Sequence, residues 1–290
     1  MNVSLVDGTT TMPDFSAAHA PVVTVRPGER FVMLTNDRFD GMDETPPRGP
    51  HDPGALVGPV AIAGAKPGDI LAIEVVSIRP RFDHAYMLGS TGFGVLGERM
   101  ERRARKVSIN DTTIQYDEHT RLPWRPMIGK LGIAPAEGAK ASTAVGDFGG
   151  AVSCTEVAPG ATLHLRVASE GALLGIEDVH GTMGDGEATA SAVEMPARVT
   201  LRCFLNPQPE LPAPLLLTQT EALTVGAGAT LDDACMEATE HMLALIMSRR
   251  NVDLTEAGLL AGAVMDLRVS FFGGQPRKAR AAVPRALLGL

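Results

Sequence analysis

Three tight turns of the form x-Pro-Gly-x limit the folds that are open to this 290-residue chain. They are Arg26-Pro27-Gly28-Glu29, Lys66-Pro67-Gly68-Asp69 and Ala158-Pro159-Gly160-Ala161, and each comes directly before a run of alternating apolar residues. Proline presets φ at the second turn position and glycine accepts a positive φ at the third, so each sequence predicts a type II turn that leads into a strand. We interpret them as three ordinary hairpins and not as an internal repeat, because the similarity ends with the turn and its strand.

The first two-thirds of the chain are predicted to be rich in strands. The 31 glycines and 21 prolines exceed the usual share of these residues, which is typical of many turns and short strands. Alternating or β-branched runs predict the strands themselves. These predicted strands lie at residues 31–34, 70–78, 107–109, 113–116, 163–167, 173–176 and 198–204.

Helix signals come only near the end of the chain. Thr230-Leu231-Asp232-Asp233 has the form of a capping box and precedes apolar residues at helical spacing, and Leu254-Thr255-Glu256 marks a second helix start. A proline-rich stretch at residues 206–214 separates this part from the rest. We therefore expect a β-rich α+β fold, with a β-sandwich or barrel-like body over residues 1–205 that carries the site. Residues 206–290 form a small α+β C-terminal portion packed on that body.

Charge and composition exclude several classes of function. The net charge is −8 and only 4% of the residues are aromatic, so neither counterion release nor base stacking favours nucleic-acid binding. No apolar stretch approaches the length of a membrane span, and the first residues lack the features of a secretory signal, so we expect a cytoplasmic protein without membrane contact. The three widely spaced cysteines predict reduced thiols. A homo-oligomer is expected for an acidic chain of this size.

Ionisable side chains concentrate between Gly175 and Glu187. Asp178 and His180 are two residues apart, so on a strand both side chains emerge from one face and can converge on one ion, or the carboxylate can orient the imidazole ring. The following Gly-Asp-Gly-Glu turn adds Asp185 and Glu187. Spacing alone leaves two interpretations open, a catalytic or metal site and a solvated hairpin, because turns collect Asp and Gly for local reasons.

This stretch resembles the Gly-Asp-x-His-x-x-x-Gly-Asp-Gly-Glu signature of the acetamidase/formamidase family. The flanking residues 171–174 and Glu194 are also similar to that family. Further similar segments occur in the same order along the chain, from about residue 22 to about residue 283. They are Thr35-Asn36-Asp37 and residues 58–70, 126–135, 148–150 and 254–270.

The resemblance implies hydrolysis of a short amide, such as formamide or acetamide, to a carboxylate and ammonia on a β-rich fold. It also implies a divalent metal, zinc first and calcium as the alternative, bound by Asp37 and His180. Glu187, or otherwise Asp185, is expected to transfer protons, with Asp178 in an orienting role. Backbone N–H groups of residues 184–186 are expected to bind the developing oxyanion.

The chain departs from the family pattern at one expected acidic position. Family members carry a Gly-Gly-Asn-Met-Asp run, whereas this chain has Ala151 in place of the Asn and Ser153 in place of the Asp, and Glu177 replaces the first glycine of the signature. A site that loses a carboxylate binds a cation less tightly unless Asp147, Glu177 or Asp178 supplies another oxygen. Two alternatives therefore stay open: a non-catalytic small-molecule binder on the family fold, and a hydrolase of a larger or cyclic amide.

Overall fold

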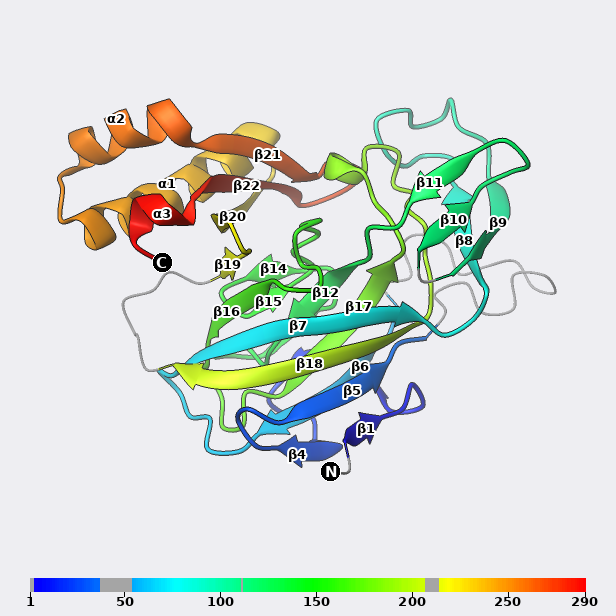
Figure 1. Ribbon diagram of the computed structural model, residues 1–290, viewed down its shortest axis with the longest axis horizontal. Helices are drawn as coiled ribbons and strands as arrows, with labels where there is room; N and C mark the ends of the chain where they lie inside the picture. The colour runs from blue at the N-terminus through cyan, green and yellow to red at the C-terminus, as the bar shows by residue number, and fades with distance from the viewer. Residues whose placement is uncertain (1–2, 37–53, 111, 207–213) are drawn as a thin grey trace.

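The computed structural model describes residues 3–36, 54–110, 112–206 and 214–290 (Figure 1). Two large sheets form the body of the molecule. Within the described residues the larger sheet has nine strands and the smaller has seven. The nine-stranded sheet has the order β1 (Ser4–Val6), β5 (Arg30–Leu34), β18 (Ala197–Asn206), β7 (Ile70–Pro80), β16 (Thr162–Arg166), β19 (Leu215–Leu217), β20 (Glu221–Gly228), β22 (Arg277–Pro284) and β21 (Asp266–Phe271).

The seven-stranded sheet contributes two strands, β12 (Met127–Gly132) and β17 (Leu174–His180), to the wall of the candidate site. Its order is β14 (Val145–Gly146), β15 (Gly149–Gly150), β12, β17, β6 (Leu56–Ile62) and β2 (Thr11–Met12), and β4 (Val23–Val25) pairs in parallel with β6. Two smaller sheets complete the strands. They contain β11 (Arg121–Pro123), β10 (Thr113–Gln115), β9 (Arg103–Ile109) and β8 (His84–Gly89), and β13 (Ala139–Ala141) with β3 (Asp14–Ser16).

The three Pro-Gly turns carry the chain from one large sheet to the other. Gly28, Gly68 and Gly160 have φ values of 87°, 96° and 92°, as type II turns require. The expectation of three hairpins is wrong, because the strands on the two sides of each turn belong to different sheets. A turn sequence fixes the local reversal of the chain, whereas strand pairing depends on residues that are distant in sequence.

The two large sheets enclose one apolar core, which confirms the β-rich α+β prediction. Phe31, Leu71 and Leu163 from the nine-stranded sheet are fully buried and belong to the same cluster as Val57 and Ile176 from the seven-stranded sheet. Strand β6 is buried along its whole length. Burial of one large aliphatic side chain contributes about 2 kcal/mol, so this cluster is the main source of stability.

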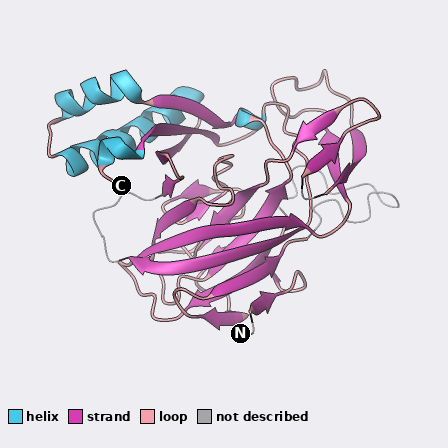
Figure 2. Ribbon diagram, in the orientation of Figure 1, coloured by secondary structure: helices cyan, strands magenta, loops and turns pink. Residues whose placement is uncertain are grey.

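The helices gather at one end of the molecule, where Figure 2 shows them in cyan. They are α1 (Leu231–Arg250), α2 (Leu254–Val264) and α3 (Arg285–Leu288), besides the short 3₁₀ turn η1 (Asp185–Glu187). Thr230 and Asp233 form the predicted capping box at the start of α1. No helix in the described part of the chain is long and apolar enough to cross a membrane.

Helix α1 packs on β20 and β22, which continue the nine-stranded sheet into the C-terminal portion. Ala238, Met242 and Ile246 of α1 are buried against Ala281 and Val283 of β22. Strand β19 pairs with β16 of the body on one side and with β20 on the other. The domain division at residue 205 stays a prediction, and strands from both sides of it belong to one sheet.

A buried arginine connects this C-terminal portion to the body. The side chain of Arg280, on β22, is 1% exposed; its Nε lies 2.8 Å from Glu156 Oε2 and its Nη2 lies 2.7 Å from Asp185 Oδ1. The Thr155 hydroxyl donates a second hydrogen bond to the same Asp185 oxygen, at 2.8 Å. Because Arg280 and Thr155 hold this carboxylate, η1 is fixed against both β22 and the loop that contains Glu156.

We expect Arg280→Ala to lower the free energy of unfolding by about 3 kcal/mol, because it removes the buried cation shared by Glu156 and Asp185 and leaves Glu156 with Arg268 alone. Asp185→Asn should cost only about 1 kcal/mol, because Arg280 keeps Glu156 as a partner. Urea unfolding followed by circular dichroism measures both changes. Arg103→Ala, in an exposed pair with Glu101, is the control and should stay within about 0.5 kcal/mol of the wild type. Equal stability of Arg280→Ala and the control would show that the Arg280 ion pairs do not stabilise the fold.

Candidate active site

A cavity of about 590 Å³ lies between the seven-stranded sheet and the ends of β21 and β22. Charged side chains from five different parts of the chain line it, one of them Glu194. Lys130 comes from β12, Asp178 from β17, Glu187 from η1 and Lys278 from β22. The other lining residues are Leu88, Gly92, Phe93, Gly94, Thr143, Ala151, Ser153, Ala190, Ser191, Phe271, Gly273, Gly274, Gln275 and Arg277.

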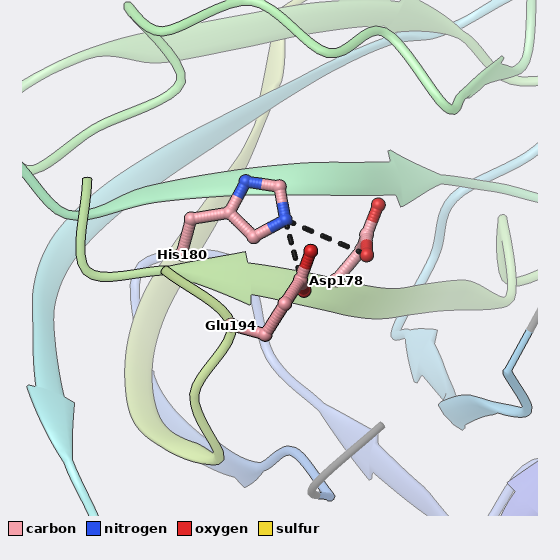
Figure 3. Close-up of side chains that lie close together, drawn as sticks. All are labelled: Asp178, His180 and Glu194. Atoms are coloured by element: carbon pink, nitrogen blue, oxygen red, sulfur yellow. Dashed lines mark ion pairs between the residues drawn. The ribbon is translucent and has the colours of Figure 1, made fainter. Parts of the chain in front are cut away.

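His180 lies at the end of β17 and faces two carboxylates. Its Nε2 is 3.1 Å from Glu194 Oε2 and 3.6 Å from Asp178 Oδ1, and Figure 3 shows both carboxylates on the same side of the ring. Glu194 reaches this position because its backbone bridges to His180 and to Tyr86 of β8. One imidazole nitrogen and two carboxylate oxygens, all within 4.8 Å of one another, are a donor set that suits a divalent metal.

The burial of His180 makes this cluster unusual. The ring is 1% exposed, yet neither of its nitrogens makes a well-aligned hydrogen bond to any residue that the structure describes. Burial acts to lower the pKa of His180, but the charges of Glu194 and Asp178 outweigh it and raise the pKa well above its ordinary value. The ring nitrogen can therefore hold a proton between two carboxylates, or it can give up that proton and bind a metal in the same place.

Asp178 adopts a backbone conformation that needs a glycine opposite. Its φ is +64°, rare for a residue other than glycine, and it lies across from Gly129 on β12. A Cβ atom on Gly129 would lie 2.9 Å from Asp178 Oδ2 and 2.8 Å from the Asp178 carbonyl oxygen. Gly129 therefore leaves the space that the Asp178 carboxylate occupies beside the cavity.

Two lysines lie within this acidic site. Lys130 Nζ is 2.6 Å from Glu177 Oε2 and 3.9 Å from Asp178 Oδ2, and both Lys130 and Glu177 are buried. Lys278 is also buried, and burial lowers its pKa to about 8 against the opposing effect of Glu187 and Asp178. The cavity thus contains cations and carboxylates at close range, and the buried ones are weakly screened by solvent.

The structure brings together part of the set of residues that the sequence singled out. Asp178 and His180 are adjacent, and Glu187 lines the same cavity. Asp185 is not among the described lining residues, because Arg280 and Thr155 hold its carboxylate. The predicted ligand Asp37 lies outside the described residues.

Two replacement oxygens considered for the lost carboxylate lie elsewhere. Glu177 is paired with Lys130, and Asp147 is exposed and lines a separate small hollow of about 170 Å³ beside α1. Sequence reasoning noted Glu194 only as a family-like flanking residue and did not identify Lys130 or Lys278. Glu194 and Lys278 come from segments with no motif of their own, so no local signal places them at the site.

Comparisons with known proteins identify the family of this chain. The model of the Acetamidase/Formamidase family matches residues 16–145 and 136–209. The crystal structure of an acetamidase from Bacillus halodurans superposes with a TM-score of 0.92 and 29% identity, covering 99% of this chain and 100% of that one. A structure titled as a predicted acetamidase/formamidase from Thermoanaerobacter tengcongensis gives 0.92 and 27%, covering 99% and 97%.

A curated relative matches over a shorter stretch. A Schizosaccharomyces pombe protein named "putative formamidase" is 23% identical over 207 residues, which span 51% of this chain and 50% of that protein. The aligned region thus covers about half the length of the relative. The family model alone spans well over half of this chain and includes β12, β17, Glu187 and Glu194. The chain therefore belongs to the acetamidase/formamidase family.

Proposed function

We propose that this protein hydrolyses a carboxylic amide to a carboxylate and ammonia in the 590 Å³ cavity. One observation carries the proposal: in a chain of this family, a buried His180 lies within 3.6 Å of two carboxylates at a cavity that also presents Glu187. Amide hydrolysis needs a polarised carbonyl, an activated nucleophile and a proton for the leaving nitrogen. Groups for all three requirements converge on this cavity.

A divalent metal fits the cluster of Asp178, His180 and Glu194. The buried, poorly hydrogen-bonded imidazole is the observation that favours a metal here, because a ligand would satisfy a ring nitrogen that the described residues leave unsatisfied. A nitrogen donor favours zinc over calcium, which prefers oxygen ligands alone. When bound, such an ion polarises a carbonyl and lowers the pKa of water. Asp37 stays a proposed additional ligand.

Glu187 is the residue best placed to transfer protons. It lines the cavity from η1, which Arg280 and Asp185 hold in place, and it does not belong to the His180 cluster. We assign to its carboxylate the removal of a proton from the attacking water and delivery of a proton to the departing nitrogen, since ammonia leaves only when protonated. The backbone N–H groups of residues 184–186 remain the proposed donors to the oxyanion.

The size of the cavity favours an acyl group longer than acetyl. A volume of about 590 Å³ is in the range of sites that hold molecules of many atoms, and Leu88, Phe93 and Phe271 give it an apolar wall. Ala151 and Ser153 are both smaller than the residues that the family pattern has in their places, and both line the cavity. A larger linear or cyclic amide is therefore the second candidate substrate.

We expect ammonia release from at least one member of a panel of formamide, acetamide, butyramide, benzamide and a small lactam, the lactam being followed by ring opening. The assay uses the purified protein before and after dialysis against a chelator, with elemental analysis of both samples. Activity should fall with metal content and return when zinc is added. Binding of an amide without any turnover would instead establish the non-catalytic binder, and no response to the whole panel would overturn the function.

His180→Ala should lose bound metal and lower turnover by roughly 10³-fold or more, since several kcal/mol of charge stabilisation depend on the ion. Glu194→Gln and Asp37→Ala should also lower metal content. The matched control is His164→Ala, which removes a buried histidine of β16 that contacts the Leu215 carbonyl. The control should cost stability but leave metal content and turnover per folded molecule unchanged. Full amide turnover by His180→Ala would end the assignment.

Glu187→Gln should keep the metal but lose rate by roughly 10²–10⁴-fold, the usual contribution of a positioned proton-transfer group. Asp185→Asn, two residues away in the same turn, should retain its rate because Arg280 and Thr155 hold Asp185. Asp178→Asn should lose roughly 10–100-fold. Steady-state kinetics and metal content of the three variants test this order of rate losses. A larger rate loss in Asp185→Asn than in Glu187→Gln would contradict it.

A further inference from the structure

A serine and a buried lysine meet at the position where this chain departs from its family. Ser153 Oγ and Lys278 Nζ lie 3.4 Å apart, and both residues line the cavity. Ser153 is 6% exposed and Lys278 is 3% exposed, and the Ser153 hydroxyl also lies 3.4 Å from the Ala151 carbonyl oxygen, to which it donates. The two residues are 125 positions apart in sequence. The topology alone brings them together.

The backbone presents Ser153 to the cavity in a strained conformation. Ser153 has a φ of +50°, and it follows Gly149 and Gly150, whose φ values are +81° and +90°. Left-handed backbone at a residue other than glycine costs about 1 kcal/mol or more and tends to occur at functional positions. The N–H of Ser153 donates to the Gly129 carbonyl at 3.0 Å, which fixes the residue to β12 beside Asp178 and Lys130. The strained serine is therefore held in place and not free to relax.

The surroundings of Lys278 favour a neutral amine as well as an ammonium. Its Nζ lies 4.8 Å from the centre of the Phe271 ring, and the residue is buried. Glu187 and Asp178 act to keep it charged, whereas burial and Lys130 act against the charge and lower its pKa to about 8. Cys154 also faces it and acts weakly to raise the pKa. An amine of this kind can accept a proton near neutral pH.

We propose that Ser153 is the nucleophile of this enzyme and that Lys278 is its general base, so that the amide is cleaved through an acyl-serine. This inference rests on the proposed amide hydrolysis and names how its first half proceeds. Serine–lysine pairs are an established arrangement for a nucleophile and its base in other hydrolase folds. On this route Lys278 takes over from Glu187 the protonation of the departing nitrogen, and Glu187, which lines the same cavity, acts on the water of the second half.

The two halves of the reaction balance as follows. Ser153 Oγ attacks the carbonyl carbon while its proton passes to Lys278 Nζ; the C–N bond then breaks as Lys278 returns that proton to the nitrogen, which leaves as ammonia. Water then attacks the acyl-serine with Glu187 accepting its proton. The C–O bond to Ser153 breaks as Glu187 gives that proton to Ser153 Oγ, which restores the serine hydroxyl, and the carboxylic acid is released. One amide and one water give one acid and one ammonia, with no oxidant or reductant.

The nearby cysteine does not meet the same requirements. Cys154 is fully buried and not among the described lining residues, and its Sγ contacts Ser270 Oγ at 3.5 Å. Burial raises the pKa of the Cys154 thiol to about 11, so it remains protonated and unreactive. Ser191 lines the cavity, but no described lysine is hydrogen-bonded to it. Ser153 is thus the hydroxyl with a base beside it.

The test is to trap the acyl-serine. Glu187→Gln is incubated with 4-nitrophenyl acetate, and intact mass and peptide mapping locate the acetyl group; slow attack by water should let it accumulate on Ser153. In the double variants Ser153→Ala/Glu187→Gln and Lys278→Arg/Glu187→Gln, the rate of acetylation should fall by roughly 10²-fold or more. A methyl group cannot attack the carbonyl carbon, and a guanidinium cannot accept the serine proton. Adding Ser191→Ala or Cys154→Ala to Glu187→Gln should leave labelling unchanged. Thermal melting of each variant separates lost folding from lost chemistry.

Ammonia release from amides, measured with the wild-type protein and with Ser153→Ala, separates the proposed amide hydrolysis from the proposed serine nucleophile. Ammonia release together with an acetyl group on Ser153 supports both. Ammonia release that survives Ser153→Ala, or an acetyl group mapped to another residue, overturns the nucleophile and leaves amide hydrolysis standing. An acetyl group on Ser153 without ammonia from any amide supports the reactive serine and overturns the amide substrate.

Discussion

Charge compensation among buried side chains around one cavity is the constraint on which the rest of this structure depends. Asp178, Glu187 and Glu194 line the same space as Lys130 and Lys278, and His180 lies behind them with almost no exposure to water. Isolated charges at such depth would cost several kcal/mol each, so each side chain is tolerable only with its neighbours in place. The cavity is therefore a single electrostatic unit, and its members cannot be assigned roles independently of one another.

The C-terminal portion is part of this unit and not an appendage to it. Strand β22 contributes Lys278 to the cavity and Arg280 to the ion pairs that fix η1, while β20 and β22 extend the nine-stranded sheet of the body. Helix α1 packs on those two strands at Gly226, where a side chain would collide with the helix backbone. The helices thus stabilise the strand that delivers one wall of the site, which explains why a fold with an apolar sandwich core needs them.

The sequence predicted features that are local and missed those that depend on distant contacts. The type II turns, strands β5, β7 and β18 and the capping box at Thr230 follow from short-range preferences, and the structure contains all of them. The Asp178–His180 spacing likewise indicated a convergent pair. Which sheet each strand joins, and the arrival of Glu194 and Lys278 at the cavity, depend on pairing across many residues. At Asp185, a signature position, nothing in the sequence indicated that the buried Arg280 holds the carboxylate, because Arg280 is 95 residues away in the chain.

The neutral side chain of Ser153 matters for Lys278, because the resemblance to the family implies an acid at this position. A carboxylate at position 153 would lie within ion-pairing reach of the Lys278 ammonium and would hold it charged, as Glu177 holds Lys130 at 2.6 Å. A serine hydroxyl is neutral, so burial dominates at Lys278 and its pKa falls to about 8. In the scheme that we propose, Ser153 therefore supplies a hydroxyl and leaves Lys278 able to act as its base. The proposed metal cluster around His180 and the proposed Ser153–Lys278 pair use different residues of one cavity, so the two proposals are compatible with each other.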